Sequence, residues 1–275
     1  MHRRSLAIAA LTASLALLAL IPGAASAYAP ADQATIHPGV MTYTDGGQCT
    51  ANFIYTGGGN TYIGQAAHCA GTGGATETNG CDAGSLPLGT PVEIDGATRP
   101  GTLAYSSWIA MQQRGETNVN ACDYNDFALV KIDPADVAKV NPSVPGFGGP
   151  VGLGGPSATG DDVFSYGNSS LRLGITYLSP KQGKVVTTVG GGWSRTVYTA
   201  TPGIPGDSGS GFLSDTGGAI GTLSTVAIAP LAGSNGVADL GRELDYANAS
   251  GTPVALENGT EPFTPDVVGA IAGGG

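Results

Sequence analysis

Histidine is scarce in this sequence of 275 residues, which holds three of them. His2 lies in a basic N-terminal stretch, and His37 lies in a polar segment that carries no motif. His68 follows a mostly apolar run at 62–67 and precedes Cys69. An imidazole at the end of a strand can serve as a general base near neutral pH, although a lone histidine there is more often structural. His68 is therefore the first candidate for catalysis.

A serine surrounded by glycines is the second candidate. Residues 203–213 read Gly-Ile-Pro-Gly-Asp-Ser-Gly-Ser-Gly-Phe-Leu, with Ser208 at the centre. A serine hydroxyl becomes a nucleophile when a base takes its proton and N–H donors stabilise the oxyanion. The glycines allow a sharp turn that points the amides of Gly206 and Ser208 into one hole. The alternative is an ordinary Gly-Ser loop, because the chain has 46 glycines.

The elbow of the α/β hydrolases, Gly-x-Ser-x-Gly, is not satisfied here. Ser210 stands where that motif needs its last glycine, and no histidine follows His68 in the chain. In that fold the histidine comes after the serine. The sequence therefore excludes an α/β hydrolase.

Two aspartates, Asp123 and Asp126, precede the apolar run 127–132. A carboxylate at this place can accept the Nδ1–H of His68, fix its tautomer and stabilise the imidazolium. Both aspartates have the required chemistry, and spacing alone does not separate them.

Four cysteines, Cys49, Cys69, Cys81 and Cys122, lie in the first half of the chain. An even number in an exported protein indicates disulfides, and four cysteines allow three pairings. The alternative is a zinc site that includes His68. Adjacent side chains on a strand point apart, however, and the sequence has no Cys-x-x-Cys pair. We therefore expect disulfides, no metal and no cofactor.

The elements that must position these side chains are short strands. With 46 glycines, 18 prolines and 12% charged residues, the composition favours an all-β protein with many tight turns. The predicted strands are apolar or alternating runs bounded by turn residues, at 51–55, 61–67, 127–132, 163–166, 184–189, 196–200 and 219–228. One helix is predicted, at Leu240–Ala249. The Pro- and Gly-rich segment 141–160 predicts a linker, and 251–275 predicts a loose, flexible tail.

Residues 1–27 have the form of a secretory signal peptide. A basic start, an apolar run at 6–21 and Ala-Ser-Ala at 25–27 predict cleavage after Ala27. A membrane anchor is the alternative, but the run is shorter than the roughly 20 residues that span a bilayer. We therefore expect a secreted, extracellular protein. Its formal net charge of −10 argues against binding to nucleic acid.

Three motifs in this order resemble the signatures of the chymotrypsin-like (trypsin-fold) serine peptidases, in particular their secreted bacterial and actinomycete branch. They are Ala-Ala-His-Cys at 66–69, Asp-Phe-Ala-Leu at 126–129 and Gly-Asp-Ser-Gly at 206–209. The resemblance implies two six-stranded antiparallel β-barrels and a C-terminal helix, with the site between the barrels. The N-terminal barrel would span 28–140, and the C-terminal barrel with its helix would span 141–250.

The resemblance also implies a role for each candidate. His68, Asp126 and Ser208 would form a catalytic triad, and the N–H groups of Gly206 and Ser208 would form the oxyanion hole. Asp126 is chosen over Asp123 because the family's aspartate immediately precedes the apolar-Ala-Leu of the strand.

A primary substrate pocket is implied as well, at Pro202, Ser224, Val226 and Gly236. No acid stands at Pro202, the position six before the serine, so a preference for Lys or Arg is not expected. Val226 would narrow the opening and favour small or medium apolar side chains.

In animal members of the family a freed N-terminus pairs with the aspartate before the serine, here Asp207. The predicted start at Tyr28 is not built for that insertion. Asp207 therefore needs an internal cation, for which Arg172 and Arg195 are both candidates. The resemblance further implies the disulfides Cys49–Cys69 and Cys81–Cys122.

The expected function is that of a monomeric, secreted serine endopeptidase acting on protein or peptide substrates, with no nucleic-acid or membrane partner. Two alternatives stay open. One is a catalytically silent homologue that binds a partner through the cleft. The other is an esterase or protease of narrow specificity on the same scaffold.

Overall fold

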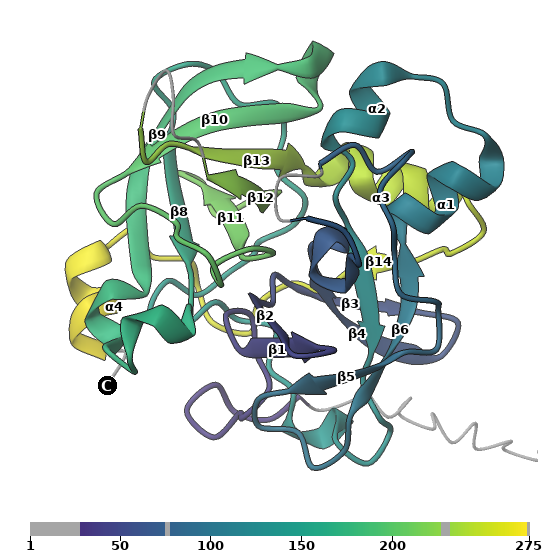
Figure 1. Cartoon of the computed structure of the whole chain (residues 1–275). Helices are drawn as coiled ribbons and strands as arrows, with labels where there is room; N and C mark the ends of the chain where they lie inside the picture. Colours follow the sequence, from purple (N-terminus) through teal and green to yellow (C-terminus); the bar gives the residue numbers. More distant parts are fainter. Residues whose placement is uncertain (1–27, 75–77, 227–231, 274–275) are drawn as a thin grey trace, which may run out of the picture.

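The computed structural model describes residues 28–74, 78–226 and 232–273 as two β units packed against each other (Figure 1). The predicted signal peptide, 1–27, lies outside the described residues. Residues 141–160 contain no helix or regular strand and connect the two units. The all-β prediction is confirmed.

The first unit is a sheet of eight antiparallel strands in the order β14-β3-β4-β7-β6-β5-β1-β2. Its strands are β1 (Met41–Thr44), β2 (Gly47–Thr50), β3 (Ile54–Gly57), β4 (Asn60–Gln65), β5 (Pro91–Ile94), β6 (Gly101–Ser106), β7 (Ala128–Lys131) and β14 (Ala255–Leu256). β7 lies between β4 and β6 near the middle of this sheet, and nearly all of its residues are buried. Its apolar side chains suit a strand that is covered on both faces.

The second unit is a closed barrel of six strands in the order β10-β13-β12-β11-β8-β9. Its strands are β8 (Asp162–Tyr166), β9 (Pro180–Val189), β10 (Ser194–Thr199), β11 (Gly211–Ser214), β12 (Ala219–Val226) and β13 (Asn235–Asp239). The barrel is filled by inward-pointing apolar side chains, namely Val163, Val185, Val197, Phe212, Ile220, Leu223 and Val237.

The first unit has eight strands where six were predicted, and one of the eight is supplied by the end of the chain. In β14, Ala255 pairs with Thr56 and Leu256 pairs with Tyr55 of β3. The chain then crosses to the second unit, where Ala270 of α4 is fully buried. The prediction of a loose tail at 251–275 is therefore wrong for the described residues.

Helix α3 (Leu240–Ala249) has the bounds predicted from the sequence. The side chain of Asp239 accepts a hydrogen bond from the N–H of Arg242 at 2.9 Å, which caps the first turn. Leu244 and Ala247 are buried one turn apart on the face that packs against the sheets.

Among the described residues, three further α-helices were not predicted: α1 (Ser107–Arg114), α2 (Val119–Tyr124) and α4 (Val267–Gly273). The same part of the chain holds five one-turn 3₁₀ helices, η1 (Ala67–Ala70), η2 (Val137–Lys139), η3 (Ser170–Arg172), η4 (Thr176–Leu178) and η5 (Gly190–Gly192). The three unpredicted α-helices have at most eight residues each, too few for a helical period to stand out in the sequence. Within the described residues, none of the helices is both long and apolar enough to cross a membrane.

Candidate active site

His68 lies in η1, directly after β4 carries the chain to the edge of the first unit. A disulfide joins Cys69 to Cys49 on β2, with their Cα atoms 6.1 Å apart, and so ties down the turn that presents the imidazole. The side chain of His68 is 26% exposed. The ring is therefore open to the solvent on one side and supported on the other.

Asp126 is the carboxylate that contacts this ring. His68 Nδ1 lies 2.6 Å from Asp126 Oδ2, and the backbone N–H of His68 donates to Oδ1 at 2.8 Å. The Ser224 hydroxyl donates to Oδ2 at 2.5 Å. Asp126 is buried, whereas Asp123 is exposed and lines a neighbouring cavity. The structure thus separates two aspartates that spacing alone left equivalent.

Asp126 and His68 shift each other's pKa in opposite directions. Burial raises the pKa of Asp126, but the charge of His68 and the hydrogen bonds from His68 and Ser224 outweigh it, and the pKa is lowered. Burial lowers the pKa of His68. The charge of Asp126 and the hydrogen bond to it raise this pKa by more, so the net effect is a raised pKa. Asp126 is therefore ionised across the neutral range.

The raised pKa of His68 predicts a shifted acid limb in the pH profile. A general base must be neutral, so kcat/KM is expected to fall as the pH drops through the His68 pKa, above its ordinary value of 6.5. Steady-state kinetics over a pH series measures this limb. In Asp126→Asn the negative charge is gone, and the limb of the residual activity should move to lower pH. A limb in the same place in both proteins would contradict the assignment of His68 as the base.

Ser208 lies on a turn that is held from behind by β2. Gly206 has φ +96° and Gly209 has φ +89°, conformations that favour glycine. The carbonyl of Gly206 accepts hydrogen bonds from Thr50 Oγ1 at 2.8 Å and Gln48 Nε2 at 3.0 Å. The carbonyl of Ser208 accepts from the N–H of Thr50 at 2.8 Å. These hydrogen bonds hold the turn through its carbonyl groups only. The N–H groups of Gly206 and Ser208 have no acceptor among the described residues.

One cleft is lined by both His68 and Ser208, together with Gly206, Ser224 and Val226. The imidazole comes from the first unit, and the hydroxyl with its neighbouring amides comes from the second. The structure therefore places His68, Ser208 and Gly206 at one opening, with Asp126 buried in contact with the ring of His68.

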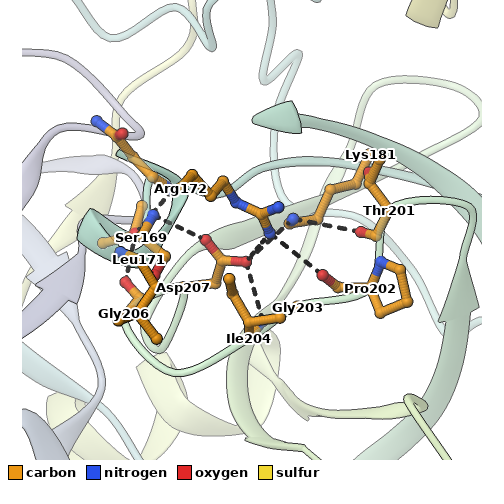
Figure 2. Close-up of polar contacts among 12 residues, drawn as sticks. Ser169, Leu171, Arg172, Lys181, Thr201, Pro202, Gly203, Ile204, Gly206 and Asp207 are labelled. Carbon is orange, nitrogen blue, oxygen red and sulfur yellow. Dashed lines mark hydrogen bonds and ion pairs between the residues drawn. The ribbon is translucent and has the colours of Figure 1, made fainter. Parts of the chain in front are cut away.

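Asp207 is fully buried beside this turn and has two cationic partners (Figure 2). Its Oδ2 lies 2.5 Å from Arg172 Nη2 and 3.1 Å from Lys181 Nζ. Arg195, the other sequence candidate, pairs with Asp239 instead. Sequence reasoning missed Lys181, because a lysine in a strand is ordinarily solvent-exposed.

The predicted pocket residues are only partly brought together. Ser224 and Val226 line the cleft, whereas Gly236 lines the neighbouring cavity behind the end of β12. Pro202 lines neither of these spaces. The cleft and this cavity adjoin, because Ser224 and Thr225 line both, and the assignment of the four residues to one substrate pocket stays a prediction.

Asn235 was not predicted as a site residue, yet its side chain lies between Gly203, in the segment before Ser208, and Thr225, at the end of β12. Its Oδ1 accepts a hydrogen bond from the N–H of Gly203 at 2.8 Å. Its Nδ2 donates to the carbonyls of Gly203 and Thr225, both at 3.3 Å. Asn235 is fully buried, so its amide bridges the segment before Ser208 and the end of β12.

The zinc alternative can be compared with the geometry. Potential ligand atoms of Cys49, His68 and Cys69 lie within 4.8 Å of one another. The two sulfurs are bonded to each other, so neither is a free thiolate that could bind a metal ion. The second disulfide joins Cys81 to Cys122, the pairing that the family resemblance implies.

Of the comparisons with known proteins, the one with solved structures identifies the fold. No protein-family model matches the sequence, and no curated protein matches it. Among solved structures, Protease A of Thermobifida fusca is 19% identical, with 82% of this chain and 99% of that chain covered and a TM-score of 0.53. A Glu endopeptidase is 15% identical, with coverage of 82% and 95% and a TM-score of 0.51. The chain has the chymotrypsin-like double β-barrel fold of serine peptidases.

Proposed function

We propose that this chain is a serine endopeptidase that cleaves peptide bonds through His68, Asp126 and Ser208. The observation that carries the proposal is the doubly hydrogen-bonded contact between Asp126 and His68, because His68 lines the cleft that Ser208 also lines. A buried carboxylate, an imidazole and a hydroxyl beside unpaired amides are the groups that acyl transfer through serine requires.

In the acylation step His68 Nε2 takes the proton of Ser208 as Oγ forms a bond to the substrate carbonyl carbon. The carbonyl π electrons move to its oxygen, which the N–H groups of Gly206 and Ser208 stabilise. His68 then gives its proton to the leaving nitrogen, and the C–N bond breaks. Water repeats the sequence on the acyl-enzyme, with His68 again as base, and frees Ser208.

Asp126 supports both steps without taking a proton. Its Oδ2 accepts the Nδ1–H of His68, which leaves Nε2 free to receive the serine proton. Its negative charge then stabilises the imidazolium. The Ser224 hydroxyl and the backbone N–H of His68 keep the carboxylate in place.

The end of β12 offers a place for the substrate backbone. β11 pairs with β12 only as far as Thr222, and Leu223 bonds to the turn at 209–210. Thr225 and Val226 pair with β13, Ser224 lies at a register shift between them and Leu223, and all three residues line the cleft. We propose that the substrate adds to this edge as an antiparallel strand, which would bring its scissile bond to Ser208.

A small or medium apolar side chain is the proposed preference before the scissile bond. Val226 stands at the cleft, and the Asn235 amide fills the space between Gly203 and Thr225. Asn235→Ala is expected to raise kcat/KM for a peptide with leucine at that position about 10-fold relative to its alanine counterpart. Kinetics on the two peptides measures the ratio. Asn248→Ala, on an exposed asparagine of α3, is the control. An unchanged ratio in folded Asn235→Ala would contradict this role.

Extracellular action is also part of the proposal. Both disulfides use every cysteine of the chain, and such pairs persist in oxidising environments outside the cytosol. The signal-peptide pattern at 1–27 agrees with this location.

A fluorophosphonate probe and casein together test the proposed function. We expect the probe to label Ser208 and the protein to digest casein. Labelling without digestion would favour the narrow-specificity esterase or protease. Absence of labelling in folded protein would favour the silent homologue and overturn the proposal.

A further inference from the structure

Lys181, on β9, is a fully buried lysine close to the candidate nucleophile. None of its side-chain surface is exposed, and its ammonium points toward the segment that precedes Ser208 (Figure 2). Lysine is almost never fully buried unless it is paired, because removing the charge from water is costly. This side chain takes no part in the proposed acyl transfer.

The segment 201–204 is held by three charged groups in succession. Lys181 Nζ donates to the carbonyl of Thr201 at 3.3 Å. Arg172 Nη2 donates to the carbonyl of Pro202 at 3.2 Å. The N–H of Ile204 donates to Asp207 Oδ2 at 3.0 Å. Each charged group therefore fixes a different main-chain atom of the segment.

Asp207 does not depend on Lys181 for its partners. Its Oδ2 has the shorter contact with Arg172, at 2.5 Å, and its Oδ1 accepts the N–H of Ser169 at 3.0 Å. Lys181 is the more distant of the two cations, at 3.1 Å. With Lys181 removed, Asp207 would keep an ion pair, and the turn that carries Ser208 would keep its anchor. Among the described residues, the carbonyl of Thr201 would lose its charged donor and keep only the Thr199 hydroxyl, which donates to it at 3.0 Å.

We propose that Lys181 is a positioning residue that fixes the segment 201–204 behind Asn235, so that its loss weakens substrate binding more than chemistry. The inference rests on the proposed peptidase function. The segment carries Gly203, whose N–H and carbonyl bond to Asn235, and Asn235 lines the cavity beside the cleft. A shift at Thr201 would therefore be transmitted to the side chain that we propose limits the substrate pocket.

The charge of Lys181 makes this role sensitive to alkaline pH. Burial lowers its pKa to about 8, with the charge of Asp207 opposing the shift and that of Arg172 adding to it. These two groups, from the Ser208 turn and from η3, are the charged groups that act on Lys181. Above about pH 8 the ammonium becomes an amine, which loses its ion pair with Asp207 and its charge-assisted bond to Thr201. KM is therefore expected to rise across this range.

Lys181→Met tests the proposal, with Lys184→Met as the matched control. Lys184 lies on the same strand, is 59% exposed and pairs with Asp162 at the surface. For Lys181→Met at about pH 7 we expect KM to rise about 10-fold, the order that one hydrogen bond to a charged group contributes, with kcat within about twofold. KM in this variant should no longer rise with pH, and Lys184→Met should match the wild type.

Labelling by the fluorophosphonate separates the two possible failures. An unlabelled wild type would mean that the peptidase proposal fails. A labelled wild type and a folded Lys181→Met with an unchanged KM, or with the alkaline rise retained, would overturn the role of Lys181. Should Lys181→Met not fold, Lys181→Arg decides, because its side chain stays charged. KM in that variant should stay level above pH 8, and a rise equal to the wild type would overturn the proposal.

Discussion

Replacing Ser208 by alanine is expected to lower kcat by about 10⁶-fold, the loss seen when a triad nucleophile is removed. Alanine has no oxygen to form the acyl bond, so the remaining rate would come from substrate binding and the amides of Gly206 and Ser208 alone. Because Ser208 is only partly buried and its hydroxyl holds no other group in place, the fold should be unaffected. Hydrolysis of a chromogenic peptide, followed to long times, gives the ratio.

Ser210 supplies the matched control for this substitution. It lies two residues further on in the same glycine-rich segment and is fully buried, and its hydroxyl has no hydrogen-bond partner among the described residues. Ser210→Ala should therefore keep wild-type activity. A Ser208→Ala protein with wild-type peptidase activity would overturn the proposed mechanism.

Local motifs explain why so much of the fold could be predicted from the sequence. The run that follows Asp126 is apolar at nearly every position, as expected for a strand buried on both faces, and it forms β7 in the centre of the first sheet. Helix α3 carries its own cap at Asp239 and a buried face at helical spacing, so its bounds could be predicted as well. In both cases the signal lies within a few neighbouring residues.

The end of the chain and the buried lysine could not be predicted, because distant residues decide them. Ala255 and Leu256 have no strand period of their own and become a strand only where the free edge of β3 receives them. Lys181 is buried because Asp207, far along the chain, offers a buried carboxylate. Such compensation leaves no local pattern in the sequence.

In the candidate site, too, some features follow from local motifs and others from residues far apart in the sequence. Each residue of the proposed triad lies in a short motif, and the motifs could be recognised one by one. The choice between Asp123 and Asp126 depends on which carboxylate faces His68, and that depends on how η1 packs against the start of β7. Asn235 lies outside every motif, and its role follows from two walls that meet only in the folded chain.

Replacing Asp126 by asparagine is expected to lower kcat by about 10⁴-fold with the fold intact. An asparagine amide can donate to Nδ1 of His68, which would place the ring proton on Nε2 and leave no base for Ser208. The neutral amide would also fail to stabilise the imidazolium. The hydrogen bonds that Asp126 accepts from Ser224 and from the N–H of His68 can be accepted by the asparagine oxygen only in part.

Asp123→Asn is the matched control, because Asp123 precedes the same strand and is exposed. It should keep kcat within about twofold, since an exposed charge contributes little to a site that it does not touch. Kinetics on both variants, with circular dichroism to verify the fold, compares the two aspartates directly. Equal losses in the two variants, or a loss confined to Asp123→Asn, would mean that His68 is not oriented by Asp126. The carboxylate that orients His68 would then have to be identified again.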